Sequence, residues 1–254
     1  MDRNKAAYKL KDFGPLYIIN LDGQPERWKW MDDQLKYWKI ENYERISAFD
    51  GRVNNLSEII SGGYPNAVSP GEIGCVTSHL KAIKHWYDTT DTEYGIFMED
   101  DCDFCSVKHW PFSWREFMSR VPYDWDCLQI AVINPRKLVA NIHPRYVDDY
   151  STAAFVVNRR YAEKLMHFHC RDDKFKLDNG VRPRAVADDL IYNAGKTYAI
   201  PLFLYKLELG STIHPEHIDV FHKSSREGLD HWWTNQSADM PIDKFFQYDT
   251  HELN

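Results

Sequence analysis

Residues 94–103 read Tyr94-Gly95-Ile96-Phe97-Met98-Glu99-Asp100-Asp101-Cys102-Asp103, an apolar run followed by four carboxylates. The run 94–98 predicts a buried strand with the acidic residues at its carboxyl end. On an extended backbone alternate side chains share a face, so we expect Asp101 and Asp103 on one side and Asp100 on the other. Two carboxylates about 5 Å apart repel by roughly 3 kcal/mol at an effective dielectric of 20, and a hard divalent cation turns that repulsion into attraction. The cluster therefore predicts a cation site, with a solvated acidic turn as the alternative.

Strand and helix patterns alternate on both sides of this segment. Further apolar runs predict strands over 16–21, 43–49, 127–132, 152–157 and 197–201. Helical spacing of apolar residues predicts helices from Pro25, from Ser69, after residue 157 and over 187–194. The helix after Ser69 has the clearest start, because Ser69-Pro70-Gly71-Glu72 combines a capping serine, an early proline and a glutamate three residues on. This alternation predicts an α/β fold with a mixed sheet layered by helices.

Length and charge limit the class of protein. We expect the 254 residues to form one domain, 1–254, with 224–254 as an irregular C-terminal extension docked on it. The formal net charge of −7 gives no overall attraction to nucleic acid or to an anionic membrane. The N-terminus lacks the apolar core of a signal peptide, and no run approaches the length of a membrane helix. We therefore expect a cytoplasmic protein without a transmembrane segment.

The five cysteines form an odd set without regular spacing, which favours reduced thiols. Cys102 and Cys105 form a C-x-x-C pair, but no second pair completes a structural zinc site. We do not expect such a site at these two residues.

Three stretches together resemble glycosyltransferase family 25, which includes lipooligosaccharide glycosyltransferases and collagen galactosyltransferase domains. They are Tyr17 to Leu21 with Pro25-Glu26-Arg27, then Ser69 to Leu80, and Ile96 to Asp101. The middle stretch, Ser-Pro-Gly-Glu-Ile-Gly-Cys-Val-Thr-Ser-His-Leu, is the most specific. Later segments between residues 151 and 205 are also similar to elements of the family, whereas the C-terminal tail has no counterpart.

The resemblance implies a GT-A fold and a hexosyltransferase. It further implies an inverting transfer from a nucleotide sugar, expected to be a UDP-sugar, to a hydroxyl of a glycan or another acceptor. GT-A enzymes hold Mn²⁺ or Mg²⁺ on the donor diphosphate with an Asp-x-Asp motif, which Asp101 and Asp103 match. Asp100 with Asp101 is a second reading of the same run. Such a metal would stabilise the charge that develops on the departing nucleoside diphosphate.

Donor-binding residues are expected near the ends of the predicted strands. Asn20 and Asp22 end the first strand and are candidates for contacts with the base or ribose, and Arg27 for a phosphate contact at a helix start. The resemblance implies a donor-site role for the Ser-His pair, and the acidic run adds two more candidates; these four residues are Ser78, His79, Glu99 and Asp100. The structural alternatives are a turn, a surface arginine and a packing histidine.

An inverting transfer needs a general base that deprotonates the acceptor hydroxyl. Asp188 and Asp189 open a predicted helix, and adjacent residues point in different directions, so only one can readily serve. We favour Asp189, which stands nearer the family's Asp-x-x-Leu pattern, with helix capping as the alternative. GT-A enzymes usually take a third metal ligand from late in the chain. The candidates are His214, His217 and His222.

Two other functions fit the same acidic cluster. A metal-dependent phosphohydrolase or nuclease would use it without a nucleotide sugar. Against this reading, the sequence has neither a nucleophilic aspartate motif after the first strand nor a basic stripe for a substrate. The other alternative is a non-catalytic carbohydrate-binding protein with a degenerate transferase fold. The intact acidic cluster and the second acidic pair argue against it.

Overall fold

The computed structural model describes residues 4–64, 67–177, 185–211 and 213–248. Its central eight-stranded sheet has the order β2-β1-β3-β7-β5-β10-β4, and β6 pairs with β10 off this path. The strands are β1 (Leu16–Asn20), β2 (Tyr43–Ser47), β3 (Tyr94–Glu99), β4 (Cys102–Asp103), β5 (Cys127–Ala131), β6 (His143–Pro144), β7 (Ala154–Asn158) and β10 (Thr197–Tyr205). A separate hairpin contains β8 (Cys170–Arg171) and β9 (Lys174–Phe175).

The sheet is mixed, as predicted. β1 is parallel to β2 and β3, and β10 is parallel to β5, whereas β7 runs antiparallel to both β3 and β5. The carboxyl ends of β1, β2, β3, β5 and β10 therefore meet at one edge. Ligand sites of open α/β sheets lie at this edge.

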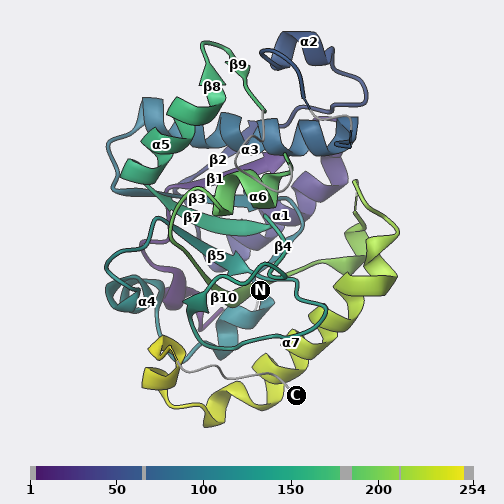
Figure 1. Ribbon diagram of the computed structural model, residues 1–254. Coiled ribbons are helices and arrows are strands. Elements are labelled where there is room, and N and C mark those ends of the chain that lie inside the picture. Colours follow the sequence, from purple (N-terminus) through teal and green to yellow (C-terminus); the bar gives the residue numbers. More distant parts are fainter. Residues whose placement is uncertain (1–3, 65–66, 178–184, 212, 249–254) are drawn as a thin grey trace.

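Helices cover both faces of the sheet (Figure 1). The α-helices are α1 (Pro25–Trp38), α2 (Leu56–Ile59), α3 (Pro70–Thr89), α4 (Trp114–Arg120), α5 (Arg159–His169), α6 (Ala187–Tyr192) and α7 (Lys223–Asn235). Side chains of β1 alternate between two cores: Leu16 and Ile18 pack with α1, α4 and α7, while Tyr17 and Ile19 pack with α3, α5 and α6. The three layers are those of a mixed α/β fold, consistent with a GT-A-like architecture.

The capping box predicted for α3 is present. Ser69 Oγ accepts from Glu72 N, and the Glu72 side chain accepts from Ser69 N at 2.7 Å. The helix also packs closely against the loop after β2. A Cβ atom on Gly74 would lie 2.5 Å from the carbonyl oxygen of Phe49, and one on Gly51 would lie 1.7 Å from that of Pro70. These two glycines permit the contact that places α3 beside the carboxyl edge of the sheet.

The C-terminal part departs from the irregular extension expected from Ser224. Residues 223–235 form the helix α7, preceded by a π-helix, η4 (Ile218–His222). Leu229, Trp233 and Phe245 are buried in the same core cluster as residues of α1 and α4. The sequence pattern concealed the helix because polar residues fill its first turns and its apolar residues gather near its end. Among the described residues, none of the helices combines the length and the apolar character needed to cross a bilayer.

The acidic run is not one extended strand. β3 ends at Glu99, the chain turns at Asp100 and Asp101, and Cys102–Asp103 then form β4, which pairs antiparallel with β10. The alternation of faces assumed for Asp101 and Asp103 therefore does not apply. The turn sends successive carboxylates to different partners.

Candidate active site

A cavity of about 490 Å³ opens at the carboxyl edge of the sheet. Its walls come from the ends of β3 and β10, the segment before β7, the helices α3 and α6, and the chain from residue 205 to η4. Six of the residues predicted for the site line this cavity: Glu99, Asp101, Asp188, His214, His217 and His222. The lining does not include Asn20, Asp22, Arg27, Ser78, His79, Asp100, Asp103 or Asp189.

Asp101 has one carboxylate oxygen paired and one unpaired. Oδ2 lies 2.9 Å from Arg27 Nη2, whereas Oδ1 is buried without a hydrogen-bond partner among the described residues. Burial raises the pKa of Asp101 to about 7; Arg27 opposes this rise, and Glu99 and Asp100 add to it. A buried, unpartnered carboxylate oxygen needs an explanation such as an ion or a water. It is available as a ligand for a cation.

Asp100 points to the protein interior instead. Its Oδ2 accepts from Asn20 Nδ2 at 2.6 Å, and its Oδ1 accepts from Arg27 Nε at 2.7 Å. The remaining nitrogen of Arg27, Nη1, donates to the carbonyls of Leu209 and Gly210, each at 3.0 Å. Every nitrogen of the Arg27 guanidinium therefore has a protein partner, and the side chain ties α1 to the acidic turn and to the segment after β10.

Asp103 has its own partners on β4. Its Oδ1 accepts from the backbone N–H of Cys105 at 2.8 Å, and its Oδ2 lies 3.3 Å from Arg226 Nη2 on α7. The structure thus brings Asp101, but not Asp103, to the cavity. Local spacing and residue type do not distinguish the two aspartates. They differ because the chain turns at Asp100 and Asp101, which leaves Asp101 at the cavity and Asp103 on β4.

The second acidic pair is divided in the same way. Asp188 lines the cavity, and its Oδ1 accepts from the backbone N–H of Ser151 at 2.6 Å. Burial raises the pKa of Asp188, with Arg145 opposing the rise. Asp189 is 5% exposed, and its Oδ1 accepts from Asn193 Nδ2 at 3.3 Å one turn later in the helix. The cavity-facing carboxylate is therefore that of Asp188.

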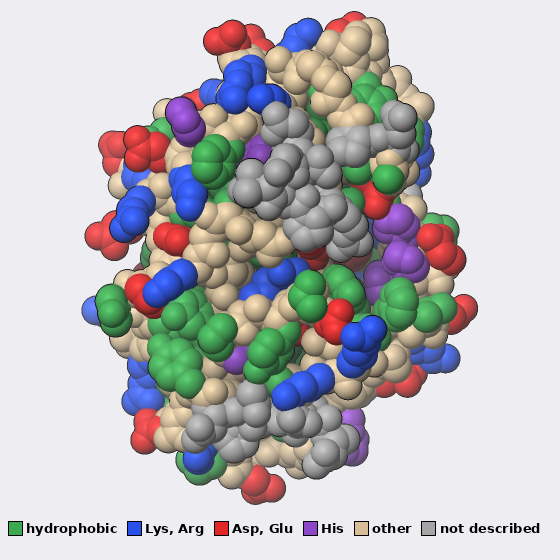
Figure 2. Space-filling model, viewed as in Figure 1, with side chains coloured by type: hydrophobic (Ala, Val, Ile, Leu, Met, Phe, Trp, Pro, Cys, Tyr) green, Lys and Arg blue, Asp and Glu red, His purple; other side chains and the backbone are tan. Residues whose placement is uncertain are grey.

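Three histidines, His214, His217 and His222, form part of the cavity wall, called here the histidine wall. The rings of His214 and His217 stack with centroids 4.6 Å apart, and His217 lies 6.5 Å from His222. His214 also pairs with Glu72 of α3, with Nε2 and Oε1 3.3 Å apart. Burial lowers the pKa of His222, which favours the neutral imidazole that binds metals. In Figure 2 a group of histidine side chains lies on the side where the chain enters α7.

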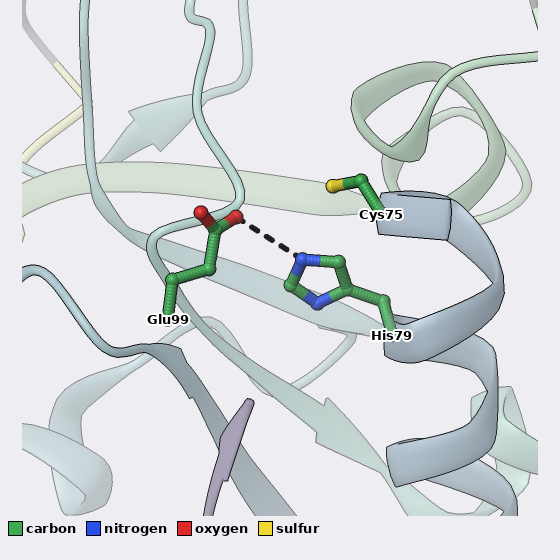
Figure 3. A group of neighbouring side chains, drawn as sticks. All are labelled: Cys75, His79 and Glu99. Carbon is green, nitrogen blue, oxygen red and sulfur yellow. Dashed lines mark hydrogen bonds and ion pairs between the residues drawn. The ribbon is translucent and has the colours of Figure 1, made fainter. Parts of the chain in front are cut away.

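Ser78 and His79 lie on the inner face of α3. Ser78 Oγ donates to the carbonyl of Gly74 at 2.6 Å and accepts from Phe49 N at 2.8 Å, which fixes the loop after β2. His79 Nε2 lies 3.1 Å from Glu99 Oε1 (Figure 3). Burial would raise the pKa of Glu99, but the bonds from His79 and Thr152 hold this pKa below its usual value.

A second polar group lies at the ends of β1 and β2. Asn20 Oδ1 accepts from Arg45 Nε at 2.8 Å, and Asp22 accepts from Arg45 Nη2 and Ser47 Oγ, each at 2.7 Å. Sequence reasoning missed Arg45 and Ser47. Their period-two spacing in the predicted strand 43–49 would have placed both on one face, beside the end of the parallel strand β1.

A known protein family matches the part of the chain that contains β1, α3 and the acidic turn. Residues 13–112, from β1 through the acidic turn, match the model of glycosyltransferase family 25 (LPS biosynthesis protein). This region of the chain is therefore similar to glycosyltransferase family 25. The match supports a glycosyltransferase, an enzyme that acts on a sugar donor and an acceptor. A search of curated proteins finds no match. The family match includes Asp101 and the capped helix α3, whereas Asp188 and the histidine wall lie outside it.

Proposed function

We propose that this protein is a metal-dependent, inverting hexosyltransferase that uses a UDP-sugar donor and an acceptor hydroxyl. One observation carries the proposal: the cavity gathers Asp101, Asp188 and three histidines from separate parts of the chain, and Asp101 Oδ1 is buried there without a partner among the described residues. An ordinary solvated acidic turn would leave both carboxylate oxygens in water.

The residues present fit a divalent cation. Asp101 offers Oδ1, and His217 and His222 line the same cavity and offer imidazole nitrogens. Both ring nitrogens of His214 already pair with carboxylates, Nδ1 with Glu216 and Nε2 with Glu72. Carboxylate and imidazole together suit Mn²⁺, while Mg²⁺ would rely more on oxygen ligands and water. Arg27 holds the other oxygen of Asp101 and so orients the carboxylate. When bound, the cation would supply Lewis-acid stabilisation of the departing diphosphate.

The nucleoside end of the donor is assigned to the adjacent ends of β1 and β2. Asn20 accepts a hydrogen bond from Arg45 there, and Asp22 accepts from Arg45 and Ser47, so their orientation is set before a ligand arrives. Preorganised polar groups lose less conformational freedom on binding. Asp22 is exposed and can accept from a ribose hydroxyl on its outer side.

Asp188 replaces Asp189 as our choice for the general base. It lines the cavity, and the Ser151 N–H holds one of its oxygens. Its raised pKa brings it closer to neutrality, where a carboxylate accepts a proton more readily from a hydroxyl. Asp189 does not line the cavity, and its side chain is buried in the protein interior.

Calorimetric titration of UDP with Mn²⁺ present and with the metal chelated tests the proposal, followed by a thermal-shift panel of nucleotide sugars. A UDP-sugar at about 100 times its dissociation constant should stabilise the fold by about 2.7 kcal/mol. Mass spectrometry should then show one added hexose on an acceptor. Equal UDP affinity with and without metal would remove the metal from the proposal, and rapid phosphoester hydrolysis without a sugar donor would favour the phosphohydrolase.

A further inference from the structure

Cys75, His79 and Glu99 converge at the border between the large cavity and a smaller one of about 60 Å³. Their sulfur, nitrogen and oxygen atoms all lie within 4.8 Å of one another. Figure 3 shows the thiol and the imidazole on successive turns of α3, both facing the carboxylate at the end of β3. Residues i and i+4 of a helix share a face, so the backbone presents Cys75 and His79 together.

We propose that these three side chains form a second metal site, selective for a thiophilic divalent cation such as Zn²⁺. This site is distinct from the one assigned to Asp101 and goes beyond the proposed transfer reaction. A thiolate and an imidazole with one carboxylate are ligands that Zn²⁺ prefers, whereas Mg²⁺ and Ca²⁺ prefer oxygen. Three protein ligands leave the fourth tetrahedral position open.

The surroundings favour a bound cation over simple packing. His79 is 1% exposed, and the ring nitrogen that it turns toward Glu99 is Nε2. Its Nε2 already lies 3.1 Å from Glu99 Oε1, close to the separation of two ligands on one ion. Thr152 Oγ1 donates to the same Glu99 oxygen at 2.8 Å. Such an outer hydrogen bond fixes the orientation of a metal-binding carboxylate.

The site has access to ions from solution. Cys75 and Glu99 line both cavities, and the larger cavity is open to the exterior. Cys75 is half-buried and forms no disulfide. On binding, the thiol loses its proton to solvent and the cation takes its place, so the chain gains a metal–thiolate bond without any oxidation or reduction.

Cobalt titration of the full chain tests the proposal, because Co²⁺ replaces Zn²⁺ and gives a near-ultraviolet charge-transfer band only when a thiolate is bound. The wild type should show this band, Cys75→Ser should lose it, and Cys170→Ser should keep it. Cys170 is also a half-buried free thiol but lies in β8, away from both cavities. Absence of the band in the wild type, or its persistence in Cys75→Ser, would overturn the proposal.

Zinc affinity provides a second measurement, by competition with a coloured chelator. His79→Gln and Glu99→Gln should each weaken Zn²⁺ binding by about 10-fold or more, since loss of even an outer partner commonly costs 10 to 100-fold. Circular dichroism of the metal-free proteins shows whether each variant folds. If one of them fails to fold, the zinc affinity of the other variant tests the proposal. Wild-type zinc affinity in a folded variant of either residue would contradict the assignment. Asp101→Asn should retain the cobalt band, which separates this site from the proposed donor metal.

Discussion

Arg27 and Asp100 form a buried ion pair at the carboxyl edge of the sheet. Arg27 Nε donates to Asp100 Oδ1 at 2.7 Å, Nη2 lies 2.6 Å from the same oxygen, and each side chain is 8% exposed. Because the guanidinium also holds Asp101 and two carbonyls after β10, it joins three segments that are distant in sequence. Arg27 therefore contributes to the stability of the fold, as a surface arginine would not.

Removal of this guanidinium should destabilise the fold. Arg27→Met leaves two carboxylates without their cation, and breaking a buried pair in this way costs about 3–5 kcal/mol. Lys29→Ala is the matched control on the same helix, because its pair with Asp33 is exposed and exposed pairs contribute little to stability. Urea denaturation measures both. Similar losses in the two variants would mean that the Arg27 pair is not buried in solution.

The two candidate metal aspartates should differ in their effect on donor binding. Asp101→Asn should reduce the gain in UDP affinity on adding Mn²⁺ by about 10-fold or more, equivalent to about 1.4 kcal/mol. Asp103→Asn should leave this gain nearly intact, because Asp103 is bonded to Arg226 and to the Cys105 N–H outside the cavity. Calorimetry with and without metal compares the variants. A larger effect at Asp103 would restore the Asp101 and Asp103 reading of the motif.

The two candidate bases should differ in turnover. Asp188→Asn should leave UDP-sugar binding nearly unchanged and lower kcat by about 100-fold or more, the usual contribution of a positioned proton acceptor. Asp189 is buried away from the cavity, so Asp189→Asn should affect stability more than kcat. Steady-state kinetics with a single acceptor, once one is found, compare the variants. If donor affinity fell in step with kcat for Asp188→Asn, the residue would belong to donor binding.

Asp188→Asn should also stabilise the folded protein at neutral pH. Burial raises the pKa of Asp188 in the folded state, so the cost of ionising this carboxylate is complete once the pH exceeds that raised pKa. The penalty shrinks as the pH falls through the folded pKa and vanishes below the unfolded pKa of about 3.9. The amide removes the penalty and keeps an oxygen for the Ser151 N–H. Melting temperatures at pH 7 and at low pH measure this difference. A variant less stable than the wild type at pH 7 would contradict it.

Two glycines of α3 should respond oppositely to alanine. Gly74→Ala places a methyl group 2.5 Å from the Phe49 carbonyl, and overpacking of this kind costs about 1–3 kcal/mol. Gly71→Ala meets its nearest atom, on Ile213, at 3.7 Å. This change should be neutral or stabilise the helix by up to about 1 kcal/mol. Chemical denaturation compares the two, and equal stability of both variants would show that the loop after β2 does not press on α3.

Local patterns were enough to predict most elements of this fold. The apolar run 94–98 is β3, and the capping box of Ser69 and Glu72 starts α3 as expected. These features depend on residues within a few positions of one another, so the sequence alone carries them. The family motifs between residues 17 and 101 likewise lie within the matched region. The sequence pattern did not predict the helix α7. Its apolar residues, Leu229, Trp232 and Trp233, lie from its middle onward, so its first turns show no apolar pattern.

Tertiary structure decided which of the acidic residues line the cavity and which are paired inside the protein. Asp100 and Asp101 differ because Arg27, 73 residues earlier in the chain, reaches both while only Asp101 borders the cavity. Asp188 and Asp189 differ because α6 docks with one carboxylate toward the backbone of Ser151 and the other toward the interior. Sequence spacing establishes that such neighbours point apart, but which of them meets the cavity depends on contacts between segments far apart in the chain, and only the packed fold brings those segments together.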